Sequence, residues 1–86
     1  MSMFSEWLAK QASKQWKSLI WKALDQVEET MLDEANVEGA KSVICAWVQD
    51  QHKVPGEFRR IAVREINAVT ATKISTFITK LEKAIA

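Results

Sequence analysis

The chain has 86 residues, of which 48% are hydrophobic and 27% charged, and its formal net charge is +1. A domain of this size buries a core, and its balanced charge argues against the strong general attraction to nucleic acid that a basic domain shows. Two glycines, one proline and the single Cys45 argue against a many-stranded sheet and exclude an internal disulfide. We therefore expect one all-α domain over residues 1–86, in a reducing compartment.

The location of the protein is predicted from two features that the sequence does not contain, a membrane-spanning segment and a signal peptide. No run approaches the roughly 20 apolar residues of a membrane span, and residues 1–10 have no basic segment followed by an apolar one, as a signal peptide would. We therefore expect a soluble, cytoplasmic protein. An interfacial membrane helix over residues 3–24 is the third interpretation, and we do not favour it because its apolar stripe has a competing use as core.

The first predicted element is a long amphipathic helix over about residues 5–34. Its apolar residues follow one stripe: Leu8, Ala12, Trp16, Leu19, Ile20, Ala23, Leu24, Val27 and Met31. Its charges are segregated, because residues 1–24 hold four lysines and one glutamate, whereas residues 25–38 hold six acidic residues and no basic one. This order opposes the helix dipole and so does not stabilise the helix itself. It reflects either drift of a solvated surface or halves that each face a partner of opposite charge.

The opposite side of this helix combines tryptophans with lysines at helical spacing. The predicted partner-binding residues are Trp7, Lys10, Lys14, Lys17 and Trp21. Aromatic rings among lysines suit a protein interface, an anionic lipid surface or a stacked nucleic acid. The alternative is that the other helices or a second subunit bury these tryptophans, so in either case we expect this side to be covered.

The second element is a short central helix over residues 37–51. Asn36 is its predicted N-cap, and the apolar run of residues 43–48 extends over more than one face, which indicates several packing partners. Replacement of Lys41 by aspartate is expected to change little.

The third element is predicted as a long helix over residues 55–85, with Pro55 in its first turn. Its apolar stripe rotates by roughly a quarter turn after the polar residues 70–73, so the helix either bends there or packs against a different neighbour.

With two outer helices of about 45 Å and a central one of about 23 Å, both outer helices would overhang. We therefore predict a three-helix, bundle-like homo-oligomer, with a dimer favoured and fold-back at residues 70–73 as the alternative. The predicted self-association residues are Phe4, Leu8, Phe77, Ile78, Leu81 and Ile85. The opposite charges of the two halves of the first helix favour antiparallel contact between copies.

Basic residues gather where the third helix begins: Lys53, Arg59, Arg60 and Arg64. A short turn before a basic helix resembles helix-turn-helix geometry only in part, because the turn contains Val54-Pro55-Gly56. Nucleic-acid binding through these residues is therefore the alternative hypothesis.

The chain offers little for catalysis. Cys45 and His52 lie on one predicted face but about 10 Å apart along the axis, beyond hydrogen-bond reach. With one histidine and one cysteine no zinc set forms, and we expect no cofactor, no metal and no enzymatic activity. The sequence predicts a small non-enzymatic protein–protein interaction module, such as an adaptor, an inhibitor or a structural accessory protein, of a size that fits a phage or bacterial origin.

Overall fold

A computed structural model describes residues 3–86 of the chain and the side chains of residues 14–86. It contains four helices, α1 (Met3–Leu32), α2 (Val37–Gln49), α3 (Gly56–Ala68) and α4 (Ile74–Ile85), and no strand within residues 3–86. The prediction of an all-helical chain is confirmed. None of the described helices combines the length and apolar character that a membrane span requires.

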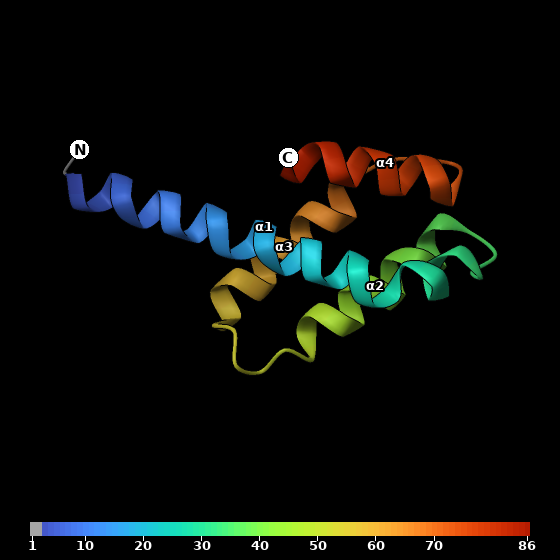
Figure 1. Ribbon diagram of the computed structural model, residues 1–86, viewed down its shortest axis with the longest axis horizontal. Helices are drawn as coiled ribbons and strands as arrows, with labels where there is room; N and C mark the ends of the chain where they lie inside the picture. Colours follow the sequence, from blue (N-terminus) through green and yellow to red (C-terminus); the bar gives the residue numbers. More distant parts are fainter. Residues whose placement is uncertain (1–2) are drawn as a thin grey trace.

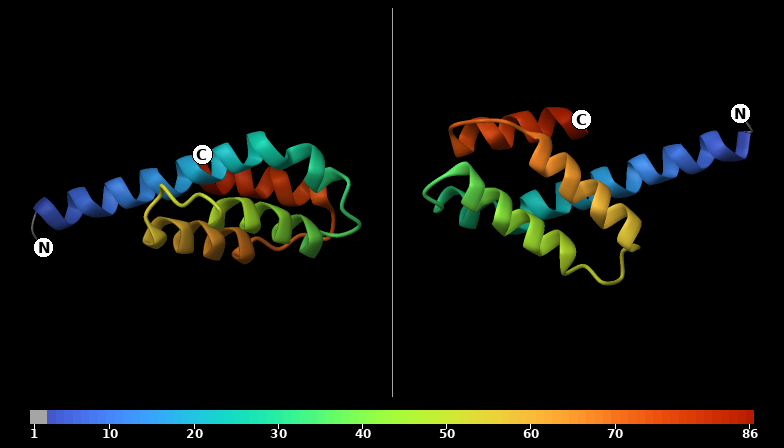
Figure 2. Two further views of the ribbon diagram at one scale, coloured as in Figure 1. Left: turned by 90° about the horizontal axis from the view of Figure 1, so that it is seen from below. Right: turned by 180° about the vertical axis from the view of Figure 1, so that it is seen from behind.

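The helices run in roughly alternating directions along the molecule (Figures 1 and 2). α1 lies between α2 and α4 in Figure 1 and packs against all three other helices. Its N-terminal part extends past the other helices, and the molecule is accordingly elongated, with extents of 46 × 24 × 17 Å. α1 is therefore both the scaffold of the core and the element that extends furthest from it.

α2 begins as predicted. Asn36 has an extended backbone conformation, and its side-chain Oδ1 accepts a hydrogen bond from the backbone N–H of Gly39 at 2.8 Å. This bond satisfies one of the N–H groups that a helix start leaves without an intrahelical partner. Ala40, Ile44 and Val48 follow at helical spacing and are fully buried, and α2 contacts each of the other helices. The prediction of a central helix with partners on more than one face is confirmed.

The prediction of one continuous helix over residues 55–85 is wrong, because the chain leaves the helix after Ala68. Val69 and Lys73 have extended backbone conformations, with φ/ψ of −73°/127° and −113°/143°. α4 then turns back and packs against α1 and α2. The β-branched residues of this connection weaken the helix, and burial of the rotated apolar set of α4 favours a second neighbour over a straight continuation. Fold-back at residues 70–73, the alternative to two overhanging helices, is what the structure contains.

Lys41 is also placed differently from expectation, since only 8% of it is exposed. Its Nζ donates a hydrogen bond to the backbone carbonyl of Asn67 at 3.2 Å and lies 3.8 Å from a carboxylate oxygen of Glu38. A lysine of α2 thus contacts the last turn of α3. The burial and the hydrogen bond of Lys41 argue against the expectation that its replacement by aspartate changes little.

Candidate functional site

One face of α1 is left uncovered by the other helices. It consists of six exposed residues at alternating spacings of four and three, which we call the α1 face: Lys14, Ser18, Trp21, Asp25, Glu28 and Leu32. In the part of the chain whose side chains are described, Trp21 (42% exposed) and Leu32 (53% exposed) are the large hydrophobic residues that stay exposed, and both belong to this face. About 16 Å of helix separates them. The α1 face therefore contains the large hydrophobic residues that the fold leaves exposed in this part of the chain.

The exposure of this face follows from the packing of the opposite side of the helix. The apolar stripe of α1 lies in the core, where its buried members are Leu19, Ile20, Ala23, Leu24 and Met31. Because residues about half a turn apart point in opposite directions, a helix that buries this stripe against α2, α3 and α4 must expose the α1 face.

The predicted partner-binding residues divide into two groups. Lys14 and Trp21 are exposed on the α1 face, and Lys17 lies beside it, half-buried, with its ammonium 5.7 Å from the centroid of the Trp16 ring. A cation over an aromatic face is attracted by the ring electrons, so Lys17 is held against its own helix. The side chains of Trp7 and Lys10 lie outside the described residues.

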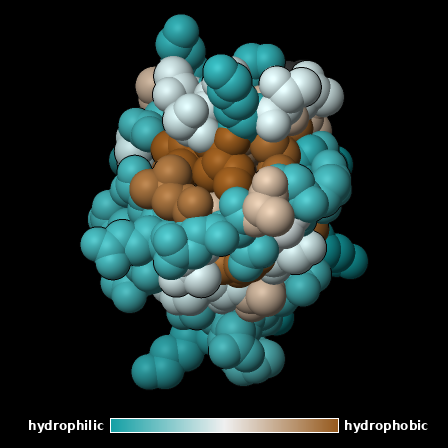
Figure 3. Space-filling view, turned by 90° about the vertical axis from the view of Figure 1, so that its right-hand side faces the viewer, coloured by the Kyte–Doolittle hydropathy of each residue, from teal (hydrophilic) through white to brown (hydrophobic). Residues whose placement is uncertain are grey.

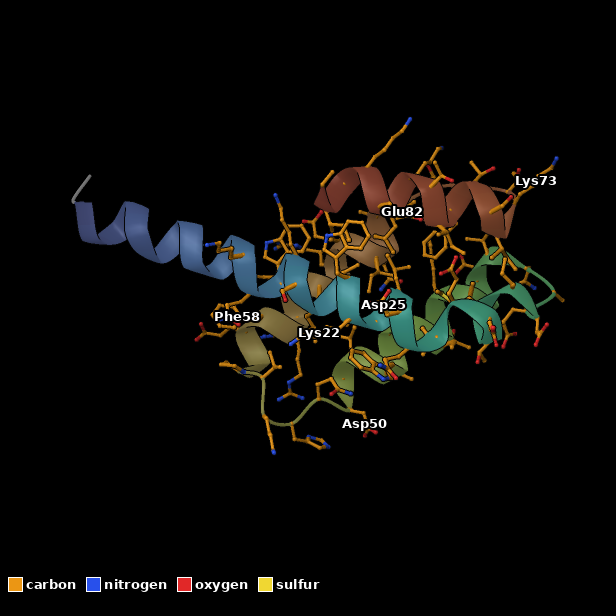
Figure 4. All side chains as sticks on the ribbon, in the orientation of Figure 1. Lys22, Asp25, Asp50, Phe58, Lys73 and Glu82 are labelled. Atoms are coloured by element: carbon orange, nitrogen blue, oxygen red, sulfur yellow. The ribbon has the colours of Figure 1, made fainter. Side chains whose placement is uncertain are left out.

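The charge on the α1 face changes sign along the helix. Lys22 and Asp25, on successive turns of α1, mark the change from lysines to carboxylates (Figure 4). Within residues 14–86 there are two ion pairs and one histidine–carboxylate contact, and none of them includes a residue of α1. The last turn of α1 contains no basic residue. The charges of the α1 face are thus not neutralised by ion pairs within this part of the chain.

A second surface lies at the start of α3. A hollow of about 620 Å³ is lined by residues of α3 and by the end of α2; we call it the arginine hollow: Gln49, Gly56, Arg59, Arg60, Val63 and Arg64. It brings together three of the four basic residues predicted for nucleic-acid binding. Lys53 is exposed in the connection before α3 but does not line the hollow.

Arg59 is held in place by two backbone carbonyl groups. Its Nε donates to the carbonyl of Val54 and its Nη1 to that of Gln49, both at 3.0 Å. These bonds connect the start of α3 to the end of α2. Arg60 and Arg64 are exposed, and Arg64 lies 3.9 Å from a carboxylate oxygen of Glu65. Guanidinium groups around a shallow hollow suit an anionic group such as a phosphate or a carboxylate. The sequence alone did not indicate that the end of α2 forms part of this surface.

The residues predicted for self-association on α4 are located in the core of the single chain. Phe77 and Leu81 have no exposed surface, and Ile78 and Ile85 are 6% and 3% exposed. They contact α1 and α2 instead of forming an overhang, which removes the geometric reason for placing a second copy on α4. The side chains of Phe4 and Leu8 lie outside the described residues. Self-association itself stays a prediction, and it requires another surface.

The thiol of Cys45 and the imidazole of His52 lie in different surroundings. Cys45 is half-buried, and burial raises its pKa above the ordinary value of 9.0, partly opposed by the nearby charge of Lys41. The side chain of His52 is 79% exposed in the connection after α2, with Nε2 3.7 Å from a carboxylate oxygen of Asp50. Among the residues with described side chains, no group of three histidine, cysteine or acidic residues is arranged to hold a metal ion.

A third area is apolar and lies at the end of the molecule that contains the α1–α2 connection and the start of α4. Hydrophobic side chains are visible there, surrounded by polar ones (Figure 3). Unlike the α1 face and the arginine hollow, this area has no pattern of charge that points to a partner.

No protein-family model, no curated protein and no solved structure matches the chain. The function is therefore argued from the chemistry of the two charged surfaces.

Proposed function

We propose that this protein is a small, non-enzymatic protein–protein interaction module that acts as a homo-oligomer, in the role of an adaptor, an inhibitor or a structural accessory protein. The observation that carries the proposal is the α1 face. It combines exposed Trp21 and Leu32 with charges that have no ion-pair partner within the described side chains. Tryptophan is enriched in the centres of protein interfaces, where a large rigid side chain loses little conformational entropy on binding.

A catalytic role receives no support from the reactive side chains. The raised pKa of Cys45 keeps its thiol protonated at neutral pH, whereas a nucleophilic cysteine requires a lowered pKa. His52 lies in an exposed connection on another part of the chain. The interaction module is therefore the simpler proposal.

The first test is affinity capture from the native cell with nucleic acid digested, followed by mass spectrometry. We expect a protein partner, or a second copy of the chain, to be retained by the unaltered protein and lost with Trp21→Glu. Lys83→Glu, which changes an exposed charge at the far end of α4, is the matched control and should retain it. If both altered proteins retain the same proteins as the unaltered chain, binding does not use the α1 face.

A second candidate function is nucleic-acid binding through the arginine hollow. The observation that favours it is that Arg59, Arg60 and Arg64 line one surface instead of being scattered around α3. Arginines that contact phosphates make binding strongly dependent on salt concentration.

Fluorescence anisotropy with labelled single-stranded and duplex DNA and RNA at about 150 mM salt separates this function from the first. Submicromolar binding that Arg60→Ala/Arg64→Ala abolishes would favour it. Arg59 is left unchanged in this variant because it also connects α2 to α3. Absence of binding would leave the arginine hollow without a role in nucleic-acid recognition.

A further inference from the structure

We propose that the partner of the α1 face is the same face of a second copy, packed antiparallel about a two-fold axis that passes beside Trp21. This inference rests on the proposed function and gives the homo-oligomer a defined interface. A two-fold interface is self-complementary, so a residue some positions before the axis meets the residue the same number of positions after it on the second copy.

The charges of the α1 face meet this requirement. Lys14 precedes Trp21 by seven positions and Glu28 follows it by seven, so Lys14 of each copy faces Glu28 of the other. Symmetry produces this pair twice. A parallel arrangement would instead place Lys14 opposite Lys14 of the second copy and Glu28 opposite its Glu28. Like charges would then face one another, which is unfavourable. The sign change along α1 thus selects the antiparallel direction.

The inner residues of the α1 face fit the same register. Ser18 lies three positions before Trp21 and Asp25 four positions after it, so the pair is one position away from the strict two-fold match, and the serine hydroxyl of one copy lies near the carboxylate of the other on the same side of the axis. Trp21 meets Trp21 of the second copy at the axis itself. Two Trp21 residues that are each 42% exposed would then cover one another, at the centre of the contact, where large aromatic residues contribute most.

The extended shape of α1 supports the same placement. Its N-terminal part continues past α2, α3 and α4 (Figures 1 and 2). Reversing the chain direction at Trp21 places this part of one copy along the C-terminal half of α1 of the other, next to the α1–α2 connection. The N-terminal part of α1, which extends past the other helices of its own chain, then has a neighbour in the second copy, and the lysine-rich half of each α1 lies against the acidic half of the other.

Charge reversal tests the register, with sedimentation equilibrium of the full-length chain at about 150 mM salt as the measurement. We expect Lys14→Glu or Glu28→Lys alone to weaken self-association by about tenfold, because each places like charges opposite one another twice. Lys14→Glu/Glu28→Lys should restore the affinity of the unaltered protein, since the pair reforms with its signs exchanged. In a single chain about 21 Å of helix separates the two positions, so the rescue requires contact between copies.

Control variants distinguish loss of the Lys14–Glu28 contact from misfolding and from a change in the overall charge of the protein. Lys83→Glu and Glu82→Lys make the same charge changes on exposed positions of α4 and should leave self-association unchanged. Circular dichroism of every variant should show the helical signal of the unaltered chain, because all four positions are exposed.

Cross-linking gives the direction independently of affinity. In a Cys45→Ala background, a mixture of Lys14→Cys and Glu28→Cys chains should form a disulfide-linked dimer, and either chain alone should form much less. Predominant linking of Lys14→Cys chains to one another would show a parallel pair and overturn the proposal.

The remaining outcomes separate this inference from the proposed function. A homo-oligomer that is insensitive to both single charge reversals overturns the α1 register but leaves the proposed homo-oligomer standing. A monomer at about 100 μM overturns both the register and the homo-oligomeric part of the proposed function. A monomer that retains a different protein through Trp21 in the capture experiment leaves the interaction module standing and overturns only the second copy as its partner.

Discussion

The ammonium group of Lys41 in α2 donates a hydrogen bond to the backbone carbonyl of Asn67 at the end of α3, at 3.2 Å. The last carbonyl groups of a helix have no intrahelical donor and carry partial negative charge. α3 contains no basic residue in its own last turn. Lys41 therefore supplies the hydrogen-bond donor and the positive charge that the last turn of α3 does not contain. This role explains why a lysine is buried in a small core.

We predict that Lys41→Met lowers the free energy of unfolding by about 1–3 kcal/mol. Methionine keeps the apolar stem but removes the donor, leaving the carbonyl of Asn67 without this bond. Urea denaturation of the full-length chain measures the change. Lys22→Met, at an exposed position of α1, is the matched control and should change the stability by less than about 0.5 kcal/mol. Equal effects of the two substitutions would contradict a structural role for the bond.

Leu81 is fully buried within one chain, and we predict that Leu81→Ala destabilises the fold by about 2–5 kcal/mol. The reason is the cavity left between α4 and its neighbours. If α4 acts within the chain, this loss does not depend on protein concentration. Thermal unfolding at concentrations a hundredfold apart, on the order of 1 and 100 μM, tests the point. The neighbouring exposed substitution Glu82→Ala should have little effect, and a loss that grows on dilution would place Leu81 at an interface between copies.

The N-cap of α2 gives a third prediction. Asn36→Ala should destabilise the protein by about 0.5–2 kcal/mol, because the N–H of Gly39 loses its acceptor. Asn36→Asp should retain most of the stability, since a carboxylate accepts the same bond and is favoured at the positive end of the helix dipole. Chemical denaturation of the unaltered protein and the two variants measures these differences. If the effect is one of substitution in general and not of capping, the aspartate variant will be as unstable as the alanine variant.

Cys45 makes stability depend on alkaline pH. Burial raises the pKa of its thiol in the folded chain above the ordinary value of 9.0, and the charge of Lys41 opposes this in part. The unfolded chain therefore loses the proton first, so this contribution to stability is fully present below pH 9 and is lost as the pH rises through the folded-state pKa. We expect the unaltered protein to lose more stability than Cys45→Ala between about pH 8 and about pH 9.5. Iodoacetamide should also modify folded Cys45 slowly at about pH 8 and faster after unfolding in urea. Rapid modification of the folded chain would contradict the burial of the thiol.

The elements that follow from local chemistry were predictable from the sequence. The apolar period of residues 16–31 placed the core stripe of α1, and Asn36 marked the start of α2, because both depend on neighbours within a few positions. The break after Ala68 was visible only as a rotation of the apolar stripe. Whether a helix bends or ends at such a point depends on the surface against which the residues after it can be buried. Here that surface belongs to α1 and α2, which are distant in sequence.

The surfaces were predictable only in part. Trp21 and Lys14 were recognised from their position opposite the apolar stripe, and both are exposed. The burial of Lys41 could not be inferred from its neighbours, because its partner Asn67 lies 26 residues further along the chain. The arginine hollow has the same origin, since the wall formed by Gln49 exists only once α2 and α3 are packed.

The connection between α3 and α4 has a consequence for how the molecule is assembled. α4 packs on α1 and α2, and the five residues 69–73 connect it to α3, with Val69 and Ala71 packed against the core. α4 therefore behaves as a tethered ligand of the rest of the chain, and its short tether gives it an effective concentration in the millimolar range. A chain cut after Thr72 becomes a two-part complex, in which a peptide of residues 73–86 exchanges with the body at a rate set by the burial of Phe77 and Leu81.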